Sequence, residues 1–153
     1  MKRLTLTIVI PLTIISFSAI TKWWYALPTD APDTMFTGFP LAFVCEGWHT
    51  SLSLQVFMTE FLMDLLIYFL FWFVLFFCID RFAIRIKTHK IVTDCLWIFA
   101  GLFAAFWILV AINKDNLFYA KRPFEMKVME TGYKFFWQNI ERPDYHRWHP
   151  KSE

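Results

Sequence analysis

The chain has 153 residues, of which 58% are hydrophobic and 21% aromatic, and its 15 basic and 13 acidic side chains leave a formal charge of +2. This apolar fraction exceeds what an ordinary soluble domain buries, so the composition favours a small membrane protein. The basic residues are scattered and no nucleic-acid-binding signature accompanies them, which argues against a nucleic-acid partner.

Three stretches are apolar enough to cross the roughly 30 Å hydrocarbon core as helices, which takes about 20 residues each. They are residues 4–21, 54–79 and 92–113. Backbone polar groups in lipid must be hydrogen-bonded within the chain, which favours helices despite the β-branched and aromatic residues. The predicted fold class is therefore an all-α integral membrane protein with about three transmembrane helices in a single membrane domain.

The first apolar stretch has a second interpretation as a cleaved secretory signal. Lys2 and Arg3 precede it, and small residues stand near its end at Ala19. An aromatic belt at Trp23 and the residues after it instead fits a retained helix anchored at the interface. Cleavage near Ala19 would leave a two-helix hairpin. In a retained helix, Pro11 is expected to produce a kink.

The orientation follows from the lysines and arginines near the helix ends. We expect the N-terminus and the basic loop at residues 80–91 to be cytoplasmic, with the loop at 22–53 and the tail at 114–153 facing outward. The basic residues of the tail, such as Lys121 and Arg122, are the main evidence against this topology. The expected location is the bacterial inner (plasma) membrane.

The outward loop combines prolines and glycines with many aromatic residues, which predicts an irregular backbone near the membrane surface. Within it, Gly38, Phe39 and Pro40 form a rigid turn. Together with Trp48 they are a candidate partner-docking element, because exposed aromatic side chains favour recognition. Packing of this turn on the helix ends is the alternative.

The tail contains apolar residues at helical spacing, with polar residues between them. This pattern predicts a C-terminal amphipathic helix that lies in the membrane interface or docks on a partner. Its apolar stripe consists of Met129, Tyr133, Phe136 and Ile140.

Two carboxylates begin the second apolar stretch. Glu60, Asp64 and Tyr68 follow one another at intervals of four, so they share one helix face near the outer end. An ionisable group inside a membrane is costly and usually faces a partner or a wet cavity, which makes these residues a candidate ion or partner site. The alternative is that both acids lie at headgroup depth or pair with a basic residue of another subunit. Few polar atoms follow deeper in this helix, whereas a pump would repeat them.

Groups for metal or cofactor chemistry are sparse. The membrane stretches hold no pair of histidines for haem iron. Cys45, Glu46 and His49 stand close together, but a second cluster is needed to complete four ligands. Three further possible ligands stand in the tail, namely Asp144, His146 and His149. We predict no metal, no cofactor and no catalytic residues.

Two functions fit these features. The first is a non-catalytic accessory, assembly or interaction subunit of a larger membrane complex, with the lipid bilayer and other membrane protein subunits as partners. The second is a small proton- or cation-translocating component that uses Glu60 and Asp64 and oligomerises to enclose them. An enzyme acting on lipid is a third alternative, with Asp64, His49 and His146 as its acid–base groups. No motif is specific enough to assign a family.

Overall fold

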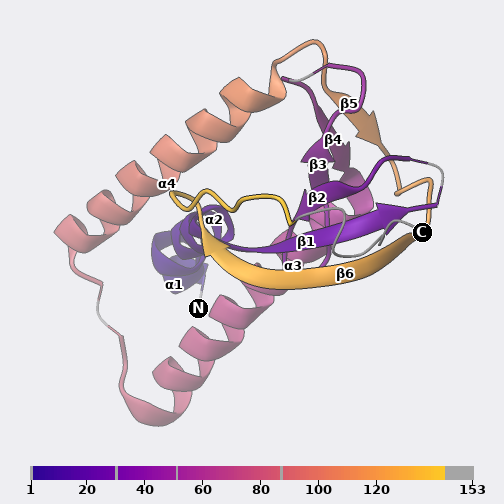
Figure 1. Cartoon of the computed structure of the whole chain (residues 1–153). Coiled ribbons are helices and arrows are strands. Elements are labelled where there is room, and N and C mark those ends of the chain that lie inside the picture. Colours follow the sequence, from indigo (N-terminus) through magenta and orange to yellow (C-terminus); the bar gives the residue numbers. More distant parts are fainter. Residues whose placement is uncertain (1, 30, 51, 87, 144–153) are drawn as a thin grey trace, which may run out of the picture. The chain divides into compact units, whose positions relative to one another are not determined.

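The computed structural model describes residues 2–29, 31–50, 52–86 and 88–143, which form helices and one β-sheet (Figure 1). The helical segments are α1 (Lys2–Leu4), a π-helical turn (Thr5–Val9), α2 (Ile10–Ala19), α3 (Met58–Cys78), a second π-helical turn (Ile79–Ala83) and α4 (Lys90–Ala111). The strands are β1 (Ile20–Pro28), β2 (Thr34–Thr37), β3 (Val44–Glu46), β4 (Leu54–Phe57), β5 (Leu117–Tyr119) and β6 (Met126–Phe135).

The chain divides into two compact units. The helical unit comprises Met1–Ala19 and Met63–Ile112, and the sheet unit comprises Ile20–Leu62 and Asn113–Glu153. Each unit is therefore built from two separate stretches of the sequence.

The prediction of an all-α protein is wrong, because the expected irregular loop and the tail together form a six-stranded mixed sheet. The strand order is β5-β4-β3-β2-β1-β6. Neighbouring strands are antiparallel except β4 and β5, which are parallel. Two strands from the tail thus occupy the two edges, one on each side of the four strands β1 to β4.

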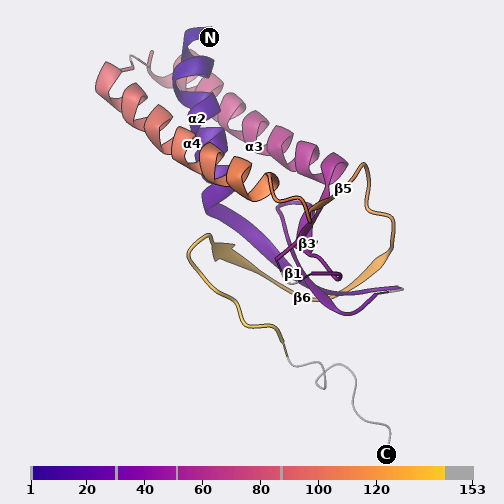
Figure 2. The same cartoon turned by 90° about the horizontal axis from the view of Figure 1, so that it is seen from above.

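The predicted C-terminal amphipathic helix is also wrong, since most of it lies in β6. This strand pairs with β1 along its whole length, and the two run side by side in Figure 2. The pairing hydrogen-bonds the backbone of a segment whose aromatic and β-branched residues prefer strands. Glycine at position 132 would weaken a helix. In the strand it leaves room for the side chain of Trp23, because a Cβ atom at this position would lie 2.6 Å from Nε1 of that indole.

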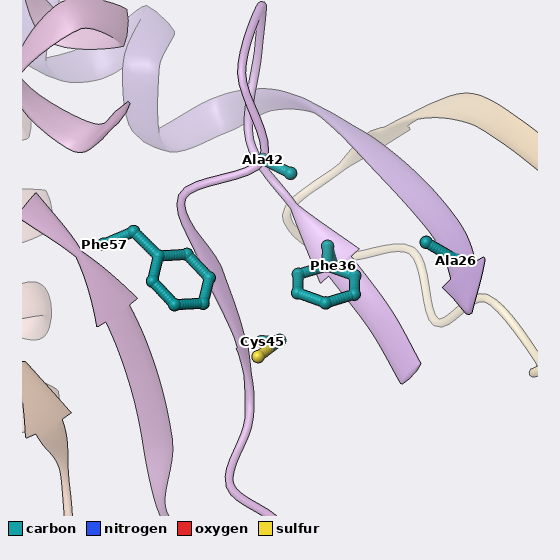
Figure 3. Packing of buried hydrophobic residues seen from close by; sticks show 5 residues of the cluster. All are labelled: Ala26, Phe36, Ala42, Cys45 and Phe57. Atoms are coloured by element: carbon teal, nitrogen blue, oxygen red, sulfur yellow. The ribbon is translucent and has the colours of Figure 1, made fainter. Parts of the chain in front are cut away.

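The core of the sheet unit is a small apolar cluster seen in Figure 3. It consists of Ala26, Phe36, Ala42, Cys45 and Phe57. Partly buried side chains packed against it are Trp24, Tyr119, Phe124 and Met126. Burial, and secondarily the charge of Glu46, raises the pKa of the Cys45 thiol to about 12, so this thiol is neutral at physiological pH.

In the helical unit the first helix is the most buried element. The indole Nε1 of Trp72 in α3 donates to Oγ of Ser16 at 2.8 Å, and that of Trp107 in α4 donates to Oγ of Ser18 at 3.1 Å. A third indole, from Trp97, donates to a backbone carbonyl of the first helix at 3.2 Å. Cleavage near Ala19 would remove all three acceptors. Retention or cleavage of the first helix stays a prediction.

The helix type changes close to Pro11, while the kink expected at this residue stays a prediction. The π-helical turn Thr5–Val9 ends two residues before this proline, which lacks the N–H that an α-helix interior needs. Pro11 is fully buried, so the local departure from α-helical geometry lies in the packed part of the unit.

Two helical segments are long and apolar enough to cross a membrane, Met58–Ala83 and Lys90–Ala111. Only 6% of the most apolar window of each is buried within the protein. Residues 54–57, expected at the start of the second helix, belong to β4, and residues 20–21 belong to β1. The chain thus passes directly from helix to strand after Ala19, and directly from strand to helix at Met58.

Candidate functional site

The first turn of α3 is attached to the segment that follows β5. The backbone N–H of Thr59 donates to the carbonyl of Ala120 at 3.0 Å, and its hydroxyl donates to the same oxygen at 2.6 Å. The backbone N–H of Arg122 donates to Oε1 of Glu60 at 3.5 Å. Glu60 also lies in the first turn of its helix, where a negative charge interacts favourably with the helix dipole. These contacts give Glu60 a structural role within the sheet unit.

The second oxygen of Glu60 has a different environment. Oε2 is buried and has no hydrogen-bond partner among the residues that the structure describes. A buried oxygen without a partner is costly to desolvate, so this oxygen is a candidate contact for an ion or for a donor group of a partner.

Asp64, one turn later, is fully buried. It is the one buried residue of α3, whose described apolar side chains are partly or fully exposed. The boundary between the two compact units falls between Glu60 and Asp64, so the two acids belong to different units. A buried carboxylate on an otherwise exposed apolar helix is the most unusual feature of this segment.

Tyr68 continues the same face of α3 by one further turn. Its ring lies edge-on to that of Phe17 in α2, with centroids 5.6 Å apart and an interplanar angle of 82°. The face that carries the predicted site residues therefore meets the first helix at this level.

The turn predicted as a docking element is integrated in the sheet unit. Gly38 has φ +150°, a conformation that favours glycine, and its carbonyl accepts a hydrogen bond from the indole of Trp24 at 2.9 Å. The ring of Phe39 contacts that of Tyr133 with centroids 5.5 Å apart. Phe39 and Pro40 are partly buried, so much of this turn packs against its own chain.

Trp48, the other predicted docking residue, is 40% exposed. Its indole donates to Oγ1 of Thr34 at 2.9 Å, and its ring packs against Phe124 with centroids 5.4 Å apart. The hydrogen bond to Thr34 and the contact with Phe124 hold the indole against the sheet unit, while the rest of its surface is accessible to solvent. Trp48 thus keeps a surface that a partner could contact.

The candidate metal ligands do not form a cluster within the described part of the chain. No group of three or more Cys, His, Asp or Glu side chains converges there. Cys45 lies in the apolar core, while a ring nitrogen of His49 is 3.2 Å from the carbonyl of Asp115. The tail ligands Asp144, His146 and His149 lie outside the described residues.

Sequence reasoning missed one polar cluster. Tyr25 in β1 is fully buried, and its hydroxyl donates to Oδ2 of Asp33 at 2.5 Å. Arg142 forms an ion pair with the same carboxylate and donates to the carbonyl oxygen of Asp33. The cluster fastens the chain after β6 to the β1–β2 connection. No local signal could have found it, because Arg142 is 109 residues away from Asp33.

The surroundings shift the pKa values of both acids of this cluster. Burial, reinforced by the hydrogen bond and charge of Asp33, raises the pKa of Tyr25 to about 12. Burial alone would raise the pKa of Asp33, but hydrogen bonds from Tyr25 and Arg142 outweigh it and hold this pKa below its ordinary value. At neutral pH the cluster is therefore a neutral tyrosine, a carboxylate and a guanidinium.

Tyr25→Phe is expected to destabilise the sheet unit by about 1 to 3 kcal/mol, because one oxygen of the buried carboxylate loses its donor. The wild type should also lose stability as pH rises from 10, the ordinary tyrosine pKa, through about 12, because the folded state resists ionisation. It should lose stability again as pH falls below 3.8 through the lowered pKa of Asp33. Thermal unfolding in detergent micelles across pH measures all three effects.

The matched control for this substitution is Tyr133→Phe, which removes the hydroxyl of a tyrosine that is 65% exposed. We expect the control to keep the wild-type unfolding temperature and the alkaline loss of stability, whereas Tyr25→Phe should lack that alkaline loss. Equal behaviour of the two variants would contradict a stabilising role for the cluster.

Comparison of the chain with protein-family models, with curated proteins and with solved structures finds no match in any of the three.

Proposed function

We propose that this protein is a membrane-anchored, non-catalytic interaction subunit, in which helices hold the six-stranded sheet at the surface of a lipid bilayer. One observation carries the proposal. Strands β5 and β6, which follow α4, pair with β4 and β1, which precede α3. Strands cannot pair across a bilayer, so both flanks of the α3–α4 hairpin lie on one side, and a hairpin that enters the membrane must cross it twice.

The exposed apolar surface of α3 and α4 supports the same proposal. These helices present large apolar side chains along their whole length, which suits lipid tails as the surrounding medium. The turn between them carries Arg81 and Arg85, which border a pocket of about 700 Å³ together with Asp80. A basic turn of this kind favours the cytoplasmic side. The sheet unit then faces outward, and a bacterial inner membrane is the proposed location.

Reporter fusions after Pro32, Thr88 and Asn139 are expected to give outward, cytoplasmic and outward signals, respectively. The reason is that the first and third positions flank the hairpin, while the second lies in its turn. The protein should also resist extraction from membranes at alkaline pH. Opposite signals at Pro32 and Asn139 would contradict the proposal, because β1 and β6 could then not pair.

The interaction role is tested by purifying the full chain in mild detergent. A partner subunit should copurify in a constant ratio, and Leu41→Ser should lower that ratio, because Leu41 is a 40% exposed apolar residue beside the Gly38 turn. Leu117→Ser, at a residue of similar exposure on the edge strand β5, is the control for a general loss of apolar surface. A protein that purifies without any other chain would contradict a subunit role.

A second function, translocation of protons or cations, is favoured by the buried carboxylate of Asp64. Asp64→Asn separates the two proposals, because the amide keeps the shape but cannot carry the charge. For an interaction subunit we expect unchanged protein amount and unchanged partners, since a neutral amide is no harder to bury than a carboxylate. Ion flux into vesicles containing the purified protein should be absent in both wild type and variant.

The control for this experiment is Asp80→Asn, which changes a carboxylate that accepts a hydrogen bond from the backbone of Ile86 in the hairpin turn. Flux that Asp64→Asn abolishes and Asp80→Asn preserves would replace the interaction proposal by the translocating one. Loss of the copurifying chain in Asp64→Asn would contradict the expectation of unchanged partners and show that the buried carboxylate supports the surface that this chain contacts.

A further inference from the structure

An exposed aromatic cluster stands at the end of β6. Phe135, Phe136 and Trp137 are 40%, 60% and 65% exposed, respectively. The rings of Phe135 and Trp137 are stacked with centroids 4.7 Å apart, and the ring of Phe136 lies edge-on to Trp137 at 5.0 Å. We name these three residues the aromatic tip.

The aromatic tip is held by a tight turn. The backbone N–H of Gln138 donates to the carbonyl of Phe135 at 2.9 Å, and the Gln138 side chain accepts from the N–H of Phe135 at 3.0 Å. These two bonds close the turn between Phe135 and Gln138, and the rings of Phe136 and Trp137 within it are exposed. The tip is thus prepared for binding before any partner arrives, which lowers the entropic cost of ordering it.

The register of the sheet locates the aromatic tip along the chain. Phe135 pairs with Ile20, the residue immediately after α2 ends at Ala19. The opposite end of the same strand pair lies at Pro28 and Met126, roughly 30 Å away at about 3.3 Å per residue. The tip therefore stands at the end of the sheet where the first apolar helix joins it.

Two cations precede the aromatic tip on the same pair of strands. Lys134 is opposite Thr21, and Lys22 is opposite Tyr133. The ammonium group of Lys22 lies 3.7 Å from the centre of the Trp24 ring. Aromatic rings followed by lysines match the order of layers that a protein meets at a bilayer surface, first the acyl boundary and then the phosphate groups.

We infer that the aromatic tip inserts into the boundary between headgroups and acyl chains of the bilayer that anchors the helices. This inference depends on the proposed membrane anchoring. Trp and Phe gain from burying apolar ring area there, while the indole N–H remains within reach of water or headgroup oxygens. The insertion fixes one end of the sheet to the lipid surface independently of the helices.

The test places a fluorescent label on the full chain in vesicles of phosphatidylcholine and phosphatidylglycerol. Cys78 and Cys95 are exposed and are replaced by serine, while the buried, neutral Cys45 is retained. Trp137→Cys then carries an environment-sensitive dye. We expect a shift of its emission to shorter wavelength and a loss of intensity when lipids bearing a nitroxide on the acyl chain are included.

Two control positions distinguish the possible failures. Glu125→Cys, next to the opposite end of β6, should show neither change. Leu70→Cys, on an exposed position of α3, should be strongly quenched if the helices span the bilayer. Quenching at Leu70 without quenching at Trp137 would overturn the lipid insertion and leave the anchoring intact. Absence of quenching at both would overturn the anchoring and, with it, the insertion.

Discussion

Gly38→Ala is expected to destabilise the sheet unit by about 2 to 5 kcal/mol, through backbone strain and overpacking together. Gly38 has φ +150°, which side-chain-bearing residues rarely adopt. A Cβ atom there would lie 2.0 Å from the carbonyl oxygen of Leu41 and 2.8 Å from the backbone nitrogen of Phe43. Both obstacles are backbone atoms, so the turn must open, and the hydrogen bond from Trp24 to the Gly38 carbonyl is lost with it.

The matched substitution is Gly101→Ala in α4, where a new Cβ atom would meet nothing within 4 Å. It should be neutral or slightly stabilising, because alanine is the better helix former. Limited proteolysis and thermal unfolding compare the two variants in the same detergent. Rapid cleavage within residues 20–57 is expected for Gly38→Ala alone. Equal resistance of both variants would show that the turn adapts to the added methyl group.

Phe57→Ala is expected to cost about 3 to 5 kcal/mol, the usual range for removing a fully buried aromatic side chain. Phe57 is fully buried, and its ring contacts those of Phe36, Tyr119 and Phe124. Total stabilities of folded domains are about 5 to 15 kcal/mol, so this single change removes a large share. The small core of the sheet unit cannot refill a cavity of this size from elsewhere.

Phe118→Ala provides the comparison, because Phe118 lies in β5 opposite Val56 and is 53% exposed. We expect a large drop in the unfolding temperature of the sheet unit for Phe57→Ala and a small one for Phe118→Ala. The readout is the protease resistance of the sheet unit as temperature rises. Similar losses in the two variants would mean that the edge strand, rather than the core, limits stability.

The helices were accessible from the sequence because long apolar runs have few alternatives. Apolar stretches of this length with few charges indicate helices by composition alone, and the described residues form three helical regions. The predicted start of the second helix is wrong, because the apolar residues 54–57 form strand β4 and the helix begins at Met58. Hydropathy does not change at that point, so only the pairing with β3 and β5 reveals it.

The sheet was missed because its local signals resemble those of other structures. Trp23 and Trp24 look like a membrane belt, but aromatic residues also favour strands. In β6 the spacing of Met129 and Tyr133 imitates a helix, while Gly132 argued against one. The deciding fact is the pairing of β6 with β1, about 100 residues away in the chain, which no local pattern encodes.

The candidate site was predictable in part. The acids Glu60 and Asp64 can be proposed from the sequence, because charge in an apolar run is conspicuous. Their separate environments were not, since the contact between Glu60 and the backbone of Arg122 joins distant segments. The same holds for the ion pair of Asp33 with Arg142.

The interrupted order of the sheet has a consequence for biosynthesis. Strands β1 to β4 leave the ribosome first, yet β1 lacks its neighbour β6 until both long helices have been made. In the proposed membrane-anchored arrangement, failure of one of these helices to insert would leave β6 on the wrong side of the bilayer, where it could not pair with β1. Pairing of β6 with β1 would then occur only in a correctly inserted chain. A misinserted chain would keep β1 as an unpaired edge strand, which quality-control proteases and chaperones can recognise.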